Sequence, residues 1–344
     1  MQDMVDKLLN WYRDNKRELP WRFDKDPYHV WISEIMLQQT RIEAVLSYYK
    51  RFMVQLPTIS SLANVDEDKL LKLWEGLGYY NRARNLKRTA VIIMEEYGGV
   101  FPTTYSEIIK LPGIGEYTAS AISSICFGEK QVTVDGNVMR VFTRFYNDLS
   151  NVSKDSTRKN IRDFLLSVVS DDAGDFNEGL MELGEVICIP NGMPKCDICP
   201  LKNNCKAYKN GNYFLYPVKN EKGKKEEIEM TVFIPIWDNK VVVRKRKELG
   251  LLHGLYEFPN IMDSKSISEI KDLSSEFGKV YDVQKSITYT HVFTNKKWKM
   301  QAYFVFLESV NCRSLFYSIS DIENSFALPT AFSPFLYQLK EELK

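Results

Sequence analysis

Residues 111–122, LPGIGEYTASAI, decide how the N-terminal half of the chain folds. Pro112 and Gly113 force a turn between two helices, the second of which should begin near Tyr117. Gly115 permits another backbone to approach closely. Backbone N–H groups of the turn and of the second helix's first turn then face outward, where they can bind phosphate. An ordinary tight turn between helices is the alternative interpretation of this stretch.

The rest of the N-terminal half is also predicted to be helical, because apolar residues recur there at three- and four-residue spacing. Charged residues then dominate 217–229, and β-rich runs follow, two of them joined by a hairpin at Asp238-Asn239. We therefore predict a helical domain over 1–212, a linker over 213–229 and an α+β domain over 230–344. The predicted helices cover residues 4–12, 29–38, 42–53, 67–74, 82–96, 117–127, 138–146 and 158–169.

Composition restricts the class of protein. A chain of 344 residues with 44% apolar residues is typical of two globular domains. It contains no apolar run long enough to span a bilayer, and residues 1–20 lack the apolar core of a signal peptide. We therefore expect a cytoplasmic protein that does not bind membranes. The net charge of +1 is uninformative about partners, although 76–94 and 195–225 are locally basic.

Four of the six cysteines fall within one short stretch, with the spacing C-x7-C-x2-C-x5-C. Four thiolates can converge on one site, and an all-sulfur site indicates zinc or an iron–sulfur cluster. The spacing does not by itself select the metal. Buried or disulfide-bonded cysteines are the alternative, which a reducing compartment disfavours. The candidate ligands are Cys188, Cys196, Cys199 and Cys205.

Two carboxylates are candidates for acid–base chemistry. Glu34 lies in WISEIMLQQT (31–40), where apolar neighbours on a helix should desolvate it and favour the protonated form that a general acid needs. Asp135 follows a short apolar run and precedes a helix. The alternatives are a glutamate that reaches water and an aspartate that caps a helix. Two carboxylates in different environments are what cleavage of a glycosidic bond requires.

In combination, these stretches resemble the MutY-type adenine DNA glycosylases of the endonuclease III superfamily, whose hairpin is a helix–hairpin–helix motif. In the C-terminal part, GLYEFP (254–259) and THVFT (290–294) look like the nudix-like domain of that family, which recognises 8-oxoguanine. The matching N-terminal stretches are 19–22 (LPWR), 31–40, 76–85 (GLGYYNRARN), 111–122, 134–140 (VDGNVMR), 181–184 and the four cysteines.

The resemblance implies an all-α helix–hairpin–helix glycosylase domain with a [4Fe–4S] cluster in the 188–205 loop, followed by an α+β nudix-like domain. It implies base-excision repair: hydrolysis of the N-glycosidic bond of adenine mispaired with 8-oxoguanine or guanine in double-stranded DNA. It further implies a monomeric, bacterial-type enzyme that acts on chromosomal DNA in the cytoplasm.

The resemblance also assigns residues by position. Glu34 is the general acid toward adenine N7, and Asp135 stabilises the oxocarbenium ion or forms a transient bond to C1′. Tyr117 and Asn137 assist. The adenine pocket is assigned to Arg17, Trp21, Arg22, Leu37 and Glu182. Contacts to DNA and to the oxidised guanine are assigned to Gln39, Thr40, Leu77, Tyr79, Gly113, Gly115 and Thr294.

Three departures from the family pattern stand out. The first gap between cysteines has seven residues rather than six. The lesion loop is Phe293-Thr294-Asn295 where the family commonly has Phe-Ser-His. The glutamate-rich metal-binding helix of nudix hydrolases is absent, since 263–277 offers only Glu269 and Glu276.

Three other functions compete with adenine removal. An endonuclease III-type lyase would carry a nucleophilic lysine at the position of Tyr117. A nucleotide hydrolase would need the metal-binding glutamates that the C-terminal domain lacks. A non-catalytic lesion-binding protein would not need Glu34 and Asp135.

Overall fold

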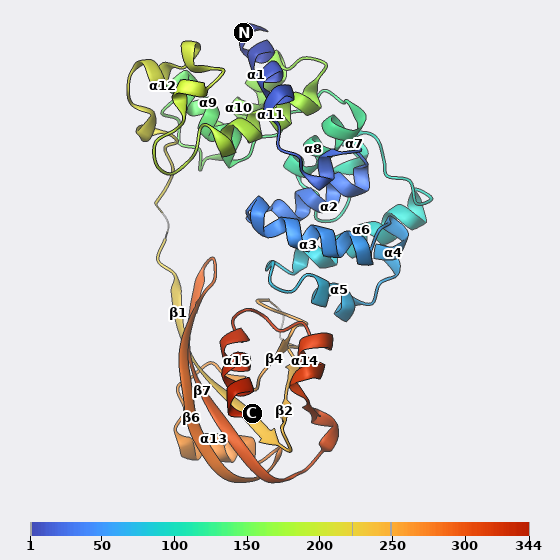
Figure 1. The fold of residues 1–344 in the computed structure, drawn as a ribbon, viewed down its shortest axis with the longest axis vertical. Helices are drawn as coiled ribbons and strands as arrows, with labels where there is room; N and C mark the ends of the chain where they lie inside the picture. The colour runs from blue at the N-terminus through green and yellow to red at the C-terminus, as the bar shows by residue number, and fades with distance from the viewer. Residues whose placement is uncertain (1, 222, 248–249, 344) are drawn as a thin grey trace. The chain divides into compact units, whose positions relative to one another are not determined.

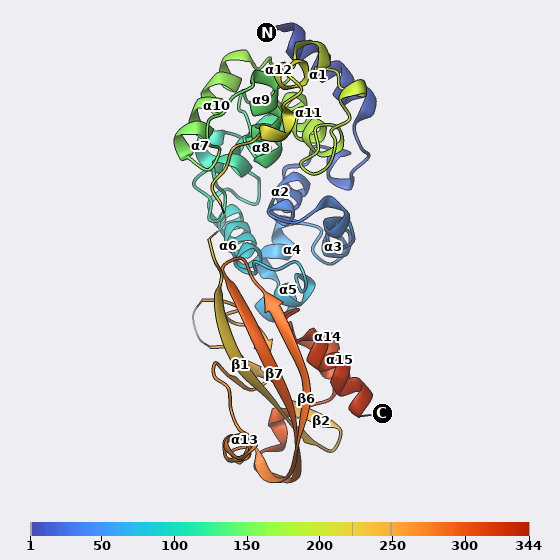
Figure 2. The same cartoon turned by 90° about the vertical axis from the view of Figure 1, so that its left-hand side faces the viewer.

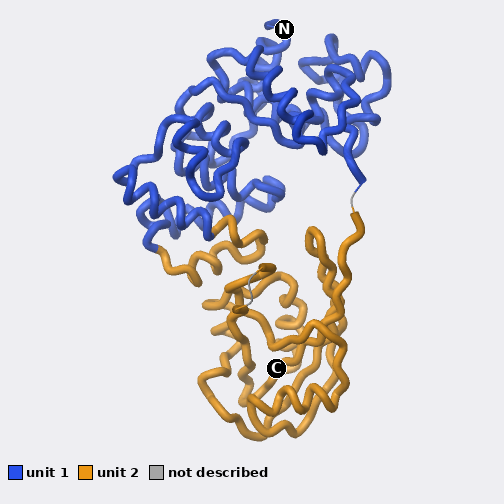
Figure 3. The backbone as a smooth tube through the Cα atoms, turned by 180° about the vertical axis from the view of Figure 1, so that it is seen from behind, with its two compact units in different colours: residues 1–64, 84–221 blue, residues 65–83, 222–344 orange. Residues whose placement is uncertain are grey.

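The structure is a computed structural model and describes residues 2–221, 223–247 and 250–343. Helices fill the chain up to the first strand, as the change in composition predicts, and the strands that follow are interspersed with further helices (Figure 1). The chain forms two compact units, of which unit 1 comprises 1–64 and 84–221 and unit 2 comprises 65–83 and 222–344 (Figure 3). The segment 65–83 therefore belongs to the compact unit that holds the C-terminal strands.

Unit 1 is helical, and every helix expected from apolar spacing is present with ends within three residues of the prediction. Four further helices lie outside the predicted ranges: α4 (Ile59–Asn64), α7 (Tyr105–Ile108), α11 (Ala173–Val186) and α12 (Lys206–Lys209). No helix among the described residues is sufficiently long and apolar to cross a membrane. The remaining helices are α1 (Gln2–Asn15), α2 (Pro27–Leu37), α3 (Ile42–Gln55), α6 (Asn81–Glu96, which begins in unit 2), α8 (Glu116–Phe127), α9 (Gly136–Tyr146) and α10 (Asp155–Val168).

The predicted hairpin lies between α7 and α8. Gly113 has φ +75°, and a Cβ there would come within 2.6 Å of Asn85 Cβ, so both the backbone conformation and the available space require glycine. The Thr89 hydroxyl donates to the Pro112 carbonyl at 2.8 Å and holds the turn from α6. Apart from its immediate chain neighbours, no atom of the described residues lies within 4 Å of a Cβ built at Gly115, so the start of α8 is left open.

A buried asparagine on α11 fixes the extended segment before α9. Asn177 Oδ1 accepts from the Thr133 N–H at 3.0 Å, and its Nδ2 donates to Ser124 Oγ and to the Gln131 carbonyl, both at 2.9 Å. A buried amide that satisfies both its donors and its acceptor makes the local backbone position specific. Asp135, which follows this segment, therefore has a defined place relative to α11.

Unit 2 is built on one sheet with the order β6–β7–β1–β2–β8, in which β1 and β7 are parallel and β5 also pairs with β1 (Figure 2). Alternate residues of β1 face opposite sides, as strand geometry requires. Val232 and Ile234 pack with residues of α14 (Ile319–Ser325) and α15 (Ser333–Glu342). Phe233 packs with residues of α13 (Ile267–Ser274) on the other side. The strands are β1 (Glu226–Trp237), β2 (Lys240–Val242), β3 (Arg244–Lys245), β4 (Tyr256–Glu257), β5 (Asn260–Ile261), β6 (Gly278–Val292), β7 (Lys296–Val310) and β8 (Phe316–Tyr317).

Local details of unit 2 confirm one expectation and modify another. The hairpin at Asp238 and Asn239 is present, and both residues have positive φ (50° and 56°), as a two-residue hairpin turn requires. Strand β1 starts at Glu226, so the last four residues of the predicted linker are strand. Glu269 forms a capping box with Ser266 at the start of α13, which gives this carboxylate a structural role.

Candidate active site

One cavity of unit 1 brings together side chains from helices α2, α3, α8, α9 and α11 and from the segments 19–22 and 39–41. It receives Glu34 from α2, Tyr117 from α8, Asp135 from the start of α9 and Glu182 from α11. These four residues are all predicted site residues, and they come from stretches that lie far apart in the chain. The cavity is lined by Leu19, Trp21, Arg22, Glu34, Leu37, Gln39, Thr40, Arg41, Ile42, Tyr117, Asp135, Asn137, Glu178, Met181, Glu182 and Glu185.

Glu34 is buried, with 7% of its surface exposed. Its helix begins at Pro27, after Asp26 caps the Tyr28 N–H at 2.7 Å, and most of the helix is buried. Burial raises the pKa of Glu34 to about 7, against a smaller opposing effect of its hydrogen bond with Tyr117. The burial of Glu34 and the direction of this pKa shift agree with the expectation that its protonated form is favoured.

Asp135 has a more polar environment than Glu34. Its Oδ1 accepts from the Val138 N–H at 2.7 Å, which makes it the N-cap of α9, and its Oδ2 accepts from Asn137 Nδ2 at 2.8 Å. Burial raises the pKa of Asp135, while these hydrogen bonds stabilise the carboxylate and oppose that shift. The Asp135 side chain therefore caps helix α9 and also lines the cavity.

An arginine holds Asn137 in place. Arg140 Nη2 donates to Asn137 Oδ1 and to the Gly184 carbonyl, both at 2.8 Å, and its Nε donates to the Cys188 carbonyl at 2.8 Å. A chain of hydrogen bonds thus runs from Asp135 to the first cysteine of the predicted metal loop. Because Arg140 is buried, this chain is shielded from water.

Paired arginines and glutamates form one wall of the cavity. Glu182, which is 1% exposed, accepts from Arg17 Nε at 2.6 Å and from Arg22 Nη2 at 3.1 Å. Arg22 Nε also donates to Glu178 at 2.9 Å, and Arg17 forms an ion pair with Glu185. Burial alone would raise the pKa of Glu182, but the two guanidinium groups hold it below its usual value. Arg17 thus acts on the cavity through Glu182 and Glu185, since it is not among the lining residues.

Tyr117 stands between the two candidate carboxylates in an uncharged form. Burial and the neighbouring carboxylates Glu34 and Asp135 raise its pKa well above the ordinary value. Its hydroxyl lies 3.0 Å from Met181 Sδ, to which it donates. A neutral phenol at this position can donate and accept hydrogen bonds, but it offers no amine for a Schiff base.

The predicted DNA-contacting residues divide between the two units. Gln39 and Thr40 line the cavity, and Gly113 and Gly115 form the hairpin of the same unit. The other three belong to unit 2, where Leu77 is buried, Tyr79 is exposed, and the hydroxyl of Tyr79 lies 2.8 Å from Thr294 Oγ1.

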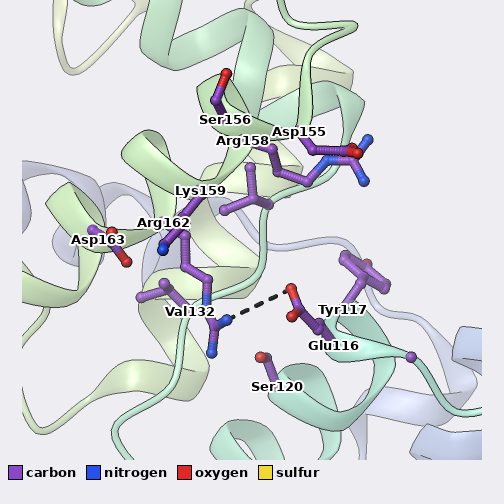
Figure 4. A pocket seen from close by; sticks show the side chains of 12 residues that line it. Glu116, Tyr117, Ser120, Val132, Asp155, Ser156, Arg158, Lys159, Arg162 and Asp163 are labelled. Carbon is purple, nitrogen blue, oxygen red and sulfur yellow. Dashed lines mark ion pairs between the residues drawn. The ribbon is translucent and has the colours of Figure 1, made fainter.

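A second cavity adjoins the first at Tyr117 and lies between the start of α8 and helix α10 (Figure 4). Its cations and carboxylates are equal in number, and Arg162 pairs with Glu116 at 3.6 Å. Its carboxylates are exposed to water, whereas Glu34 is buried. The first cavity is therefore the stronger candidate for acid–base chemistry. The charged residues of the second are Glu116, Asp155, Arg158, Lys159, Arg162 and Asp163.

The four cysteines of the 188–205 loop are free thiols that line one further cavity. Arg144 Nη1 lies 3.3 Å from Cys188 Sγ and donates to the Ile189 carbonyl at 2.9 Å. Across the described ranges 2–221, 223–247 and 250–343, no group of three or more His, Cys, Asp or Glu side chains is arranged to hold a metal ion. The sulfur donors thus share a cavity but are not gathered in a ligand geometry.

Sequence reasoning missed part of the cavity because it missed helix α11. Glu178, Met181 and Glu185 line the site alongside the predicted Glu182. The signal was present in the sequence, since Phe176, Leu180 and Leu183 recur at helical spacing and are all buried.

Comparison with known proteins identifies the class. The HhH-GPD superfamily of base excision DNA repair proteins matches residues 32–165, and the NUDIX domain matches 231–338. The adenine DNA glycosylase of Buchnera aphidicola subsp. Baizongia pistaciae is 34% identical over 343 residues, which covers 97% of this chain and 96% of the relative. That of subsp. Schizaphis graminum is 40% identical over 256 residues, covering 74% and 73%. A solved thermostable thymine-DNA glycosylase has a TM-score of 0.54 at 31% identity and covers 60% of this chain and 95% of its own.

The protein is therefore a DNA glycosylase, a hydrolase acting on glycosyl bonds, with a helix–hairpin–helix domain followed by an α+β NUDIX domain. Within that class, the chain belongs to the adenine DNA glycosylase family and acts in base excision repair.

Proposed function

We propose that the enzyme removes adenine mispaired with 8-oxoguanine, and with lower preference adenine opposite guanine, from double-stranded DNA. The observation that carries the chemical part is the pairing, in one cavity, of a buried glutamate whose pKa is raised to about 7 with a hydrogen-bonded aspartate. A protonated acid and an ionised carboxylate are the two groups that glycosidic cleavage requires. We also infer that the enzyme acts as a monomer on chromosomal DNA in the cytoplasm.

In the proposed reaction, the adenine nucleotide is flipped out of the duplex into the cavity, because the glycosidic bond is inaccessible within the stack. Glu34 protonates adenine at N7, so the base leaves as a neutral molecule. Asp135, whose carboxylate form the Val138 N–H and Asn137 stabilise, stabilises the sugar cation at C1′ or bonds to it transiently. Water completes the hydrolysis and leaves an abasic site.

The adenine pocket is proposed to be the wall formed by Trp21, Arg22, Leu37 and Glu182, with Arg17 outside the lining holding Glu182 in place. Its buried ion pairs fix the positions of the donors and acceptors before the base enters. Trp21 is buried and packs edge-on against Tyr49, with ring centroids 5.1 Å apart, so the indole plane is fixed as well. A rigid, partly apolar wall of this kind suits a planar base.

Recognition of the opposite base is proposed to lie with Gln39 and Thr40 of unit 1 and with Leu77, Tyr79 and Thr294 of unit 2. Tyr79 suits a role as a wedge, because its aromatic ring is exposed at the end of a turn. Thr294 offers a hydroxyl that can hydrogen-bond to a base edge. Leu77 is buried, so its contribution is to the shape of the turn that carries Tyr79.

We further infer that Cys188, Cys196, Cys199 and Cys205 hold a [4Fe–4S] cluster. All four are thiols that line one cavity, and the donor set suits iron or zinc. Such a cluster would cross-link the loop and, through the Cys188 carbonyl, support the Arg140–Asn137 hydrogen bonds that reach Asp135. The purified protein should be brown, and Cys126 and Cys312 should be dispensable for the colour. A colourless protein with stoichiometric zinc would contradict the assignment.

The proposed function is tested by base release from duplexes that carry 8-oxoguanine:A, G:A or thymine glycol, each with and without alkali. We expect adenine release from the first duplex and more slowly from the second, none from the third, and strand cleavage only after alkali. A borohydride-trapped Schiff base as the main product would instead favour a lyase. Tight lesion binding without release would favour a non-catalytic protein.

A further inference from the structure

Helix α5 (Glu67–Leu73) and the turn after it are attached to the C-terminal part of unit 2 along one face. Lys72 Nζ donates to the Phe326 carbonyl at 2.9 Å, and Glu75 Oε1 accepts from the Leu328 N–H at 2.7 Å. Lys72 and Glu75 also form an ion pair at 2.5 Å, and both are only partly exposed. The two side chains therefore hold residues 326–328 between them as a coupled pair of tethers.

A further contact supports the same attachment. Asp68, one turn before Lys72 on α5, forms an ion pair with Lys245 and lies 3.4 Å from the Tyr256 hydroxyl. The Tyr256 ring stacks on Phe326, with centroids 4.3 Å apart. The segment that Lys72 and Glu75 hold is thus also in contact with Tyr256, which Asp68 of the same helix approaches.

The turn after α5 has a fixed shape. Trp74 is fully buried, and its indole N–H donates to the Gly78 carbonyl at 3.1 Å. Arg82 Nη2 donates to the same carbonyl at 3.2 Å, and its guanidinium lies over the rings of Trp74 and Tyr79, 5.4 Å from each centroid. Tyr79, at φ 50°, is left 45% exposed at the end of this turn.

The exposed end of the turn meets the loop between β6 and β7. The hydroxyls of Tyr79 and Thr294 lie 2.8 Å apart, within hydrogen-bonding distance. We propose that Lys72 and Glu75 are positioning residues for recognition of the base opposite adenine: they hold α5 and its turn against residues 326–328 so that Tyr79 and Thr294 form one surface. This inference rests on the proposed function, and it requires neither residue to touch DNA.

The test is the ratio of adenine excision efficiency on 8-oxoguanine:A to that on G:A, measured with the full-length protein. We expect Glu75→Ala to lower the ratio about two- to tenfold, the effect of one lost hydrogen bond. Glu75→Gln should retain most of the ratio, because its amide oxygen can still accept from the Leu328 N–H. Lys72→Met keeps the apolar stem and loses the donor, so it should resemble Glu75→Ala. The matched control is Lys69→Met, an exposed lysine on the same helix.

A double-mutant cycle separates positioning from general destabilisation. If Glu75 acts through Thr294, then Thr294→Ala should cost much less in a Glu75→Ala background than in the wild type. Melting curves establish folding, and Lys72→Met replaces Glu75→Ala in the cycle if the latter does not fold. An unchanged ratio in both variants, a ratio not restored by Glu75→Gln, or fully additive effects would each overturn the inference. A wild-type enzyme without any preference for 8-oxoguanine would reject the proposed function itself.

Discussion

The cavity of unit 1 and the Tyr79–Thr294 surface of unit 2 use polar groups in opposite ways. In the cavity, Glu34 and Glu182 are almost entirely buried, and burial together with neighbouring charges sets their protonation. On the surface, two uncharged hydroxyls lie beside each other and remain accessible. Electrostatic interactions are stronger where water is excluded. An accessible hydroxyl contributes little, because a hydrogen bond to a ligand replaces one that it already makes to water. We therefore expect the rate of base excision to change greatly when a single atom in the cavity is replaced. We expect the preference between opposite bases to change only by small factors when a surface hydroxyl is removed.

The largest effect is expected from removal of either carboxylate. Glu34→Gln keeps the shape but not the transferable proton, and Asp135→Asn removes the charge that faces the sugar. Each should reduce single-turnover excision by about 10²–10⁴-fold or more, with nearly unchanged affinity for the lesion duplex. The matched control is Glu95→Gln on an exposed part of α6. If the excision rate of the Glu34→Gln enzyme lay within a few-fold of the wild-type rate, the expected contrast between the cavity and the recognition surface would be absent.

The pH dependence of excision should follow Glu34. A general acid must be protonated, so the rate should be fully developed below the pKa of about 7 and fall about tenfold per pH unit above it. Asp135 must be ionised, so the rate should also fall at acid pH, at a value shifted upward from that of an ordinary aspartate. Single-turnover excision rates measured from acid to alkaline pH would show both the fall caused by Asp135 and the fall caused by Glu34. The preference for 8-oxoguanine should not follow the same curve, because neither Glu34 nor Asp135 belongs to the Tyr79–Thr294 pair.

A third experiment compares two glycines of the hairpin. Gly113→Ala places a Cβ against Asn85 at a positive φ, so it should lower the free energy of unfolding by about 1–3 kcal/mol. Apart from its immediate chain neighbours, Gly115→Ala meets no atom of the described residues and should leave unfolding nearly unchanged. If the hairpin binds a phosphate backbone, Gly115→Ala should instead weaken duplex affinity. Denaturant unfolding and binding of duplex DNA distinguish these outcomes, and equal destabilisation by both changes would contradict this account.

The smallest effect is expected on the recognition surface. Thr294→Ala should lower the preference for 8-oxoguanine:A over G:A about two- to tenfold, since one hydrogen bond contributes about 0.5–1.5 kcal/mol. Its rate on G:A should change little. Thr294→Ser, which keeps the hydroxyl, is the matched control. An unchanged preference would transfer recognition to Gln39, Thr40 and Tyr79.

Much of the fold could be predicted from local patterns. Apolar spacing located most helices of unit 1, and the Asp238-Asn239 pair located a hairpin, because helical and strand periodicity and turn conformation are properties of neighbouring residues. The resemblance placed Glu34, Asp135 and Tyr117 in one site, and the structure brings them into one cavity. Their catalytic roles stay predictions.

The sequence by itself indicated the family, the turn at Pro112-Gly113 and the candidate carboxylates, since each of these motifs consists of residues close together in the chain. Only the tertiary structure decided that Glu178 and Glu185 share the cavity, and that Arg140 links Asp135 to Cys188. It also decided that residues 65–83 belong with the C-terminal strands. These features arise from contacts between residues far apart in sequence, and burial, which sets the pKa of Glu34, exists only once those contacts exclude water.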